Sequence, residues 1–130
     1  VLTSEARSSL PEAVTLYDAK FNIGRVSLFV NSMAQGDIDH LGIATQDRLH
    51  QDYRAALLPG INSVMKGALS AGADCVFISG SGPSVIAISE DRGMTVCYEM
   101  RESASKAGVH GEIRITQPSL YGASLQVINK

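Results

Sequence analysis

A long amphipathic pattern runs through the first third of the chain. Five apolar residues recur there at intervals of four and three positions, and they are Ala19, Ile23, Val26, Val30 and Met33. This spacing predicts one face of a helix. Thr15 and Asp18 have the spacing of a capping box at the start of that helix, and Gly36 suits its end.

Shorter or weaker patterns predict four further helices. Residues 3–10 read as a short helix that ends before Pro11. Residues 38–49 are more polar and loosely periodic, which indicates a helix with a narrow buried stripe. Residues 59–72 and 94–107 each place apolar side chains at helical spacing.

Four segments carry the patterns of strands. Residues 75–78 and 85–88 are short apolar runs, whereas residues 112–116 and 123–127 alternate polar and apolar positions. Alternation indicates a sheet with one covered face and one face in water. The order of elements therefore predicts an α+β fold, with an antiparallel sheet of about four strands covered by helices.

Composition and charge narrow the possible functions. The 130 residues fit one domain, and 45% hydrophobic and 18% charged residues are ordinary for a globular protein. A formal net charge of −2 without a basic stripe argues against nucleic acid as a partner. No apolar run approaches the ~20 residues that span a bilayer, and no secretory segment is recognisable, so we expect a cytoplasmic protein.

Cysteine and histidine give no sign of a metal centre. Cys75 and Cys97 each fall on an apolar periodicity, which favours buried thiols over a disulfide or a pair of metal ligands. His40, His50 and His110 are scattered without metal-binding spacing. We therefore predict no metal site from these residues.

The loop between the two apolar strands is the strongest candidate for chemistry. Its residues are Ser79, Gly80, Ser81, Gly82, Pro83 and Ser84. Glycine allows close backbone approach and positive φ, and proline fixes φ near −65°. Such a loop could hold an anion, line a substrate site or simply turn a hairpin. It is not a Walker A loop, because no Gly-Lys-Ser/Thr closes it.

Two arginines could complete a site at this loop. Arg7 and Arg54 each offer a planar fork of donors that matches a carboxylate or phosphate, although either could be a solvated surface charge. Ser79, His50 and Asp52 could be assembled into a nucleophilic triad on paper, but no spacing places them together. No catalytic residue is therefore assigned.

Several segments together resemble a family of small-molecule kinases. Residues 71–84, AGADCVFISGSGPS, resemble the third conserved motif of the GHMP kinases. Residues 3–11 are similar to the Ser-Thr-x-x-Ala-Arg-x-x-Leu-Pro segment of the homoserine kinase subfamily. FNIGR at 21–25 and DRLHQDYR at 47–54 are similar to two more segments of that subfamily, in the same order along the chain.

The resemblance implies a fold and an activity. It implies the ferredoxin-like C-terminal domain of a GHMP kinase. Homoserine kinases transfer the γ-phosphoryl group of ATP, with Mg²⁺, to the hydroxyl of L-homoserine on the way to threonine. They lack an obvious catalytic base, so catalysis would rest on positioning and charge stabilisation.

The resemblance also assigns roles to individual residues. Arg7 and Arg54 would bind the homoserine carboxylate, with Thr3 and Gly80 close to the substrate. Ser79, Ser81, Gly82 and Pro83 would support the phosphate site.

One expected motif of the family does not occur in residues 1–130. This is the glycine-rich phosphate loop, Pro-x-x-x-Gly-Leu-Gly-Ser-Ser, so we expect the chain to be a C-terminal fragment whose N-terminal ATP-binding domain is absent. The fragment alone would be inactive, and its open sheet edge could pair with a second copy in a homodimer. Two alternatives remain: another GHMP-type kinase, and a non-catalytic α+β ligand-binding domain.

Overall fold

The computed structural model describes residues 3–119, 121–123 and 125. Six helices and two strands follow one another along this part of the chain. They are α1 (Thr3–Ser8), α2 (Leu16–Gln35), α3 (Leu41–Ala44), α4 (Gln51–Ala55), α5 (Ile61–Ser70), β1 (Cys75–Ile78), β2 (Val85–Ile88) and α6 (Gly93–Lys106). Within these ranges, no helix is both long and apolar enough to cross a membrane.

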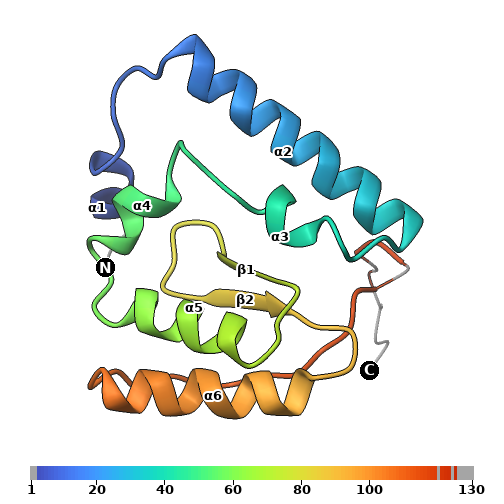
Figure 1. Ribbon diagram of the computed structural model, residues 1–130. Coiled ribbons are helices and arrows are strands. Elements are labelled where there is room, and N and C mark those ends of the chain that lie inside the picture. Colours follow the sequence, from blue (N-terminus) through green and yellow to red (C-terminus); the bar gives the residue numbers. More distant parts are fainter. Residues whose placement is uncertain (1–2, 120, 124, 126–130) are drawn as a thin grey trace, which may run out of the picture.

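The two strands form an antiparallel hairpin in the middle of the protein. Cys75 pairs with Ile88 and Ile78 pairs with Val85, so residues 79–84 close the hairpin. In Figure 1, α5 and α6 lie on one side of this small sheet, and α2 and α3 lie on the other. The predicted α+β class, with helices covering an antiparallel sheet, is confirmed.

Alternate side chains of β1 join the two helical layers, because successive residues of a strand point to opposite faces. Val76 and Ile78 face α5 and α6, where two clusters of buried residues form the core. The clusters comprise Ala68, Ala71, Val76 and Val96 in one, and Leu58, Ile61 and Ile78 in the other. On the opposite face, Phe77 meets Phe29 of α2 edge to face, with ring centroids 6.0 Å apart.

Helix α2 begins and ends where the sequence predicts. The Thr15 hydroxyl accepts a hydrogen bond from the backbone N–H of Asp18 at 3.1 Å. Gly36 ends the helix in the left-handed conformation, with φ of 70°. These two caps confirm both boundaries, because each supplies partners for backbone groups that the helix itself leaves unpaired.

The predicted apolar face of α2 points to solvent. Ile23, Val26 and Val30 are 67%, 61% and 62% exposed. The helix contacts the rest of the protein through its other side instead, by way of the Phe29 ring and the side-chain amide of Asn22.

The prediction of one helix over residues 38–49 is wrong, because only Leu41–Ala44 is helical. The Thr45 hydroxyl donates to the carbonyl of Leu41 at 2.9 Å, and the Asp47 carboxylate accepts from the backbone N–H groups of the residues that follow it. Short polar side chains that bond to nearby backbone groups compete with the helical pattern. The helix therefore stops at Ala44, and a loop leads to α4.

The described residues form two strands, where the sequence predicts about four. Residues 112–116 carry no regular secondary structure, and Ile115 is 58% exposed. Glu112 and Arg114 form an ion pair, with Nε and Oε1 2.9 Å apart. A strand needs a neighbouring backbone to pair with, and no described residue pairs with this segment. The other predicted strand, 123–127, lies largely outside the described residues.

Candidate functional site

The loop at 79–84 is a compact turn with two internal backbone bonds. The N–H of Ser79 donates to the carbonyl of Ser84 at 2.8 Å, and the N–H of Gly82 donates to the carbonyl of Ser79 at 3.0 Å. Gly80 and Gly82 have φ of 57° and 78°, and the bond from Gly82 to Pro83 is cis. Glycine suits position 82, because residues with a Cβ rarely adopt this positive φ, and a Cβ there would lie 2.6 Å from Cδ1 of Leu58, which would have to shift.

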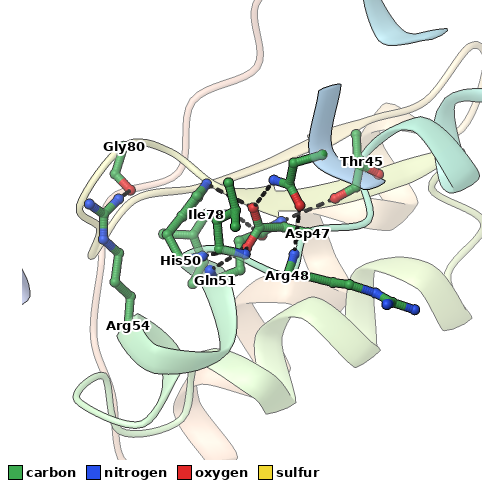
Figure 2. Close-up of polar contacts among 10 residues, drawn as sticks. Thr45, Asp47, Arg48, His50, Gln51, Arg54, Ile78 and Gly80 are labelled. Atoms are coloured by element: carbon green, nitrogen blue, oxygen red, sulfur yellow. Dashed lines mark hydrogen bonds and ion pairs between the residues drawn. The ribbon is translucent and has the colours of Figure 1, made fainter. Parts of the chain in front are cut away.

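Arg54, in the last turn of α4, reaches this loop. Its Nη1 donates a hydrogen bond to the carbonyl oxygen of Gly80, as Figure 2 shows. Among the described residues this is the one hydrogen bond of the guanidinium, which carries five N–H donors. The structure thus brings together two of the predicted site residues, although they are 26 positions apart.

The other two predicted substrate residues are not joined to this pair by any described contact. Arg7 lies in the last turn of α1 and is exposed. Ala6, its neighbour, is 2% exposed, so α1 packs one side against the rest of the protein. Thr3 begins α1, and its side chain lies outside the described part of the structure.

Asp47 organises the loop that leads into α4. Its Oδ2 accepts from the backbone N–H groups of Leu49, His50 and Gln51 at 3.0, 2.7 and 2.7 Å. Its Oδ1 accepts from the side-chain amide of Asn22 on α2 at 2.6 Å. We call Asn22, Asp47, His50 and Gln51 the Asp47 cluster; most of its bonds are drawn in Figure 2.

The bonds of this cluster decide the charge state of Asp47. Burial, which leaves its side chain 5% exposed, raises the pKa of the carboxyl. The bonds from Gln51, His50 and Asn22, and the nearby imidazole, outweigh burial and hold that pKa below its ordinary value of 3.8. Asp47 is therefore a charged structural acceptor at neutral pH, with both oxygens engaged, and is poorly suited to take a proton from a substrate.

Gln51 connects α4 to the sheet. Its Oε1 accepts from the backbone N–H of Ile78 at 2.9 Å, and its Nε2 donates to the carbonyl of Thr45 at 3.1 Å. Ile78 is the last residue of β1, immediately before the loop. One side-chain amide therefore links the helix that carries Arg54 to the strand that carries the loop.

The triad that could be drawn on paper is not formed. His50 lies against Asp47, with Nε2 and Oδ1 3.4 Å apart, and its buried Nδ1 has no partner in the described structure. Neither Ser79 nor Asp52 is bonded to this imidazole in the described contacts.

Cys75 does not supply a nucleophile either. Burial raises the pKa of the Cys75 thiol, so this thiol stays protonated and is a poor nucleophile near neutral pH.

Asp47 and Gln51 also line a cavity of about 460 Å³. Its walls come from α3, residues 45–47 and 51–52, α5 and β1, and include Asp52 and Lys66. Arg54 and residues 79–84 are not among its lining residues. The cavity is therefore distinct from the place where Arg54 meets the loop.

A family comparison identifies this arrangement of helices and hairpin. The family described as "GHMP kinases C terminal" matches residues 29–106, which include α3, α4, α5, both strands and α6. The chain belongs to this family. The GHMP kinase C-terminal resemblance seen in the sequence is confirmed.

The relatives of this GHMP domain include proteins named homoserine kinase. The one from Persephonella marina is 36% identical over 97% of this chain, which covers 42% of that protein. The one from Moorella thermoacetica is 40% identical over 93% of this chain, which covers 41% of that protein. The GHMP domain thus spans about two fifths of the length of these relatives.

A solved structure agrees with the fold. The crystal structure of homoserine kinase from Cytophaga hutchinsonii superposes with a TM-score of 0.77 at 33% sequence identity. The match covers 82% of this chain and 34% of that one.

Sequence reasoning missed the two residues that organise the GHMP domain's candidate site. Asp47 and Gln51 stood within the similar segment 47–54, but neither was assigned a role. Their partners lie 25 and 27 positions away, at Asn22 and Ile78. One signal was available: an aspartate followed by a short polar segment is typical of a side chain that binds backbone N–H groups.

Proposed function

We propose that this domain forms the homoserine-binding part of a homoserine kinase, which transfers the γ-phosphoryl group of ATP to L-homoserine in threonine biosynthesis. Support comes from the names of its relatives and from the residues gathered at the loop. The observation that carries the proposal is the bond from Arg54 to the carbonyl of Gly80.

This bond holds the Arg54 guanidinium against the glycine-containing loop at residues 79–84. The Nε of Arg54 is buried, so a guanidinium held through Nη1 keeps mainly its Nη2 group for a second acceptor, and a carboxylate matches its planar fork. Arg54 would bind the carboxylate of homoserine, and Gly80 would bring backbone close to the substrate. Arg7 and Thr3 complete the proposed substrate site, while Ser79, Ser81, Gly82 and Pro83 hold the loop that supports the phosphate site.

ATP and Mg²⁺ are assigned in this proposal to the N-terminal domain that GHMP kinases carry. The described residues contain no group of three or more histidine, cysteine, aspartate or glutamate side chains that could hold a metal ion. A cytoplasmic location and a homodimer paired at the open sheet edge are further parts of the proposal.

In the reaction, the hydroxyl oxygen of homoserine forms a bond to the γ-phosphorus. The bond from that phosphorus to the bridging oxygen breaks, ADP leaves and the hydroxyl proton is released. Asp47 is poorly suited to take the hydroxyl proton as a general base, because both of its oxygens already accept hydrogen bonds. This domain would contribute by holding the alcohol in line, which is a large part of the catalysis of phosphoryl transfer.

Arg54→Ala in the full-length protein tests the assignment. Loss of a charge-assisted bond costs ~1.5–3 kcal/mol, which corresponds to a roughly 10- to 100-fold rise in KM for homoserine. The KM for ATP should stay nearly constant. Arg54→Lys should also be impaired, because lysine lacks the planar fork.

These kinetics, a panel of small alcohols and calorimetry together decide between the proposal and its alternatives. Unchanged homoserine kinetics in Arg54→Ala would remove homoserine as the ligand of this site. Faster turnover of a different small alcohol would indicate another GHMP-type kinase. Tight binding of homoserine or threonine by residues 1–130 alone, measured by calorimetry, would favour a non-catalytic ligand-binding domain.

A further inference from the structure

Helix α4 is too short to hold Arg54 in place by itself. It spans Gln51–Ala55, five residues, and none of them is buried. Isolated helices shorter than about 12 residues are marginal in water, and most helices are stabilised by a packed apolar face. At its end, Ala55 packs against the cluster of Leu58, Ile61 and Ile78. Polar contacts supply the rest of the anchoring that places the Arg54 guanidinium.

The first of these contacts is at the start of the helix. The Asp47 carboxylate binds three successive backbone N–H groups, the last of which belongs to Gln51, the first residue of α4. The side-chain amide of Asn22 on α2 donates to this carboxylate, and its side-chain oxygen, Oδ1, accepts from the backbone N–H of Arg48 at 3.0 Å. The entry to α4 is thereby fixed to a long helix.

The second contact fixes α4 to the sheet. Gln51 and Arg54 are three positions apart, so they lie on the same face of the helix. Gln51 binds the N–H of Ile78, and Arg54 binds the carbonyl of Gly80, two residues further along. Figure 2 shows both side chains directed from α4 toward this segment.

We propose that Gln51 and Asp47 are positioning residues for Arg54. Gln51 sets the distance between α4 and the end of β1, and Asp47 sets the direction in which α4 leaves the preceding loop. Neither residue touches the substrate. The role of Arg54 in binding homoserine rests on the proposed function, but the placement of Arg54 by these two residues can be tested without it.

Gln51→Met in the full-length protein is the first test. Methionine has nearly the length of glutamine but offers no amide to Ile78 or Thr45. We expect KM for homoserine to rise on the order of tenfold, because small misplacements of a binding group are costly, with KM for ATP unchanged within about twofold. Gln35→Met, at the exposed end of α2, is the matched control and should leave both constants unchanged.

A reciprocal exchange tests Asp47 independently of loss of folding. In the original protein, the Asn22 amide donates to the Asp47 carboxylate. Asp47→Asn can place two amide donors opposite each other, and Asn22→Asp places two carboxylates opposite each other, so each single variant loses the bond. The double variant restores one donor facing one acceptor, and residue 22 can still accept from the N–H of Arg48. We expect each single variant to raise KM for homoserine, and the double variant to return it to within about threefold of the original value.

Amide hydrogen exchange separates this proposal from the kinase assignment. Gln51→Met should speed exchange over residues 51–55 and 79–84, whatever ligand the site binds. If Arg54→Ala leaves homoserine kinetics unchanged but exchange in Gln51→Met responds, the assignment of Arg54 to the homoserine carboxylate fails and the positioning role stands. If Gln51→Met lowers Tm without changing either exchange at 79–84 or KM for homoserine, the positioning role is overturned.

Discussion

Helices α4 and α5 are neighbours along the chain, yet different forces hold them in place. Helix α5 packs apolar side chains into the core: Ile61 is 5% exposed and Ala68 is fully buried. Helix α4 fully buries none of its residues; only Ala55 packs against the core, and bonds from Asp47 and Gln51 supply the rest of its anchoring. Apolar packing fixes α5 without strict geometry, whereas the place of α4 depends on a few donors and acceptors at defined distances.

The difference bears on function, because α4 carries Arg54 and α5 carries none of the candidate site residues. Hydrogen bonds are directional, and a bond to a charged group weakens steeply when distance or angle changes. A helix held by such bonds places one guanidinium accurately at small cost in buried surface. Stability and site geometry should therefore respond to different substitutions in this protein.

The largest loss of stability is expected in α5. Ile61→Ala removes a buried side chain from the cluster with Leu58 and Ile78, and large-to-small changes of this kind cost about 2–5 kcal/mol. Urea unfolding measures the change. Leu69→Ala on the same helix is the control, because Leu69 is 50% exposed and its truncation should cost less than about 1 kcal/mol. Equal losses in the two variants would contradict the assigned packing.

Asp47→Ala should be next in size. It removes the acceptor of three backbone N–H groups and one side-chain amide, and an unsatisfied buried donor costs about 1–3 kcal/mol. We expect a loss of about 2 kcal/mol, because water can reach some of the freed groups. Asp39→Ala, at an exposed aspartate in the turn before α3, should change stability by less than about 0.5 kcal/mol.

Acid should weaken the polar region selectively. The pKa of Asp47 is lower in the folded protein than its ordinary value of 3.8. Its contribution is therefore fully present above about pH 4 and is lost as pH falls through the folded value. Urea unfolding at pH 7 and pH 3 measures how far the free energy of unfolding falls between the two conditions. The fall should be smaller for Asp47→Asn than for the original protein, whereas Ile61→Ala should show the same fall as the original protein.

The smallest effect is expected at the end of α3. Thr45→Val keeps the shape of the side chain but removes the hydroxyl that donates to the carbonyl of Leu41, which should cost about 0.5–1.5 kcal/mol. Thr95→Val on the exposed side of α6 is the control and should be nearly neutral. A larger loss at Thr95 than at Thr45 would show that the hydroxyl does not help end α3.

The elements that could be predicted are those whose patterns are local. The hydrophobic spacing of α5 and α6, the Thr15 cap and Gly36 end of α2, and the apolar strands β1 and β2 all follow from residues within a turn or two of one another. The prediction of a long helix at 38–49 was wrong, and the cause is also local. Thr45 and Asp47 bond to backbone groups there, and periodicity does not weigh that competition.

The candidate site could be predicted only in part. Arg54 and the loop at 79–84 were found from their chemistry and their resemblance to a family, and the bond to Gly80 joins them. The roles of Arg54, Gly80, Thr3 and Arg7 in binding a substrate all remain predictions. Asp47 and Gln51 were missed because their meaning depends on Asn22 and Ile78, which spacing along the chain cannot bring into contact.

The sequence by itself determined the α+β class, the caps of α2, the hairpin and the kinase family. These depend on local propensity, hydrophobic period and motifs, which each residue carries with it. Only the tertiary structure decided which side of α2 faces inward, and that α4 is held by amide and carboxylate bonds between its polar residues, α2 and β1. The physical reason is that such bonds join partners more than 20 positions apart, and their geometry exists only after the helices have packed on the sheet.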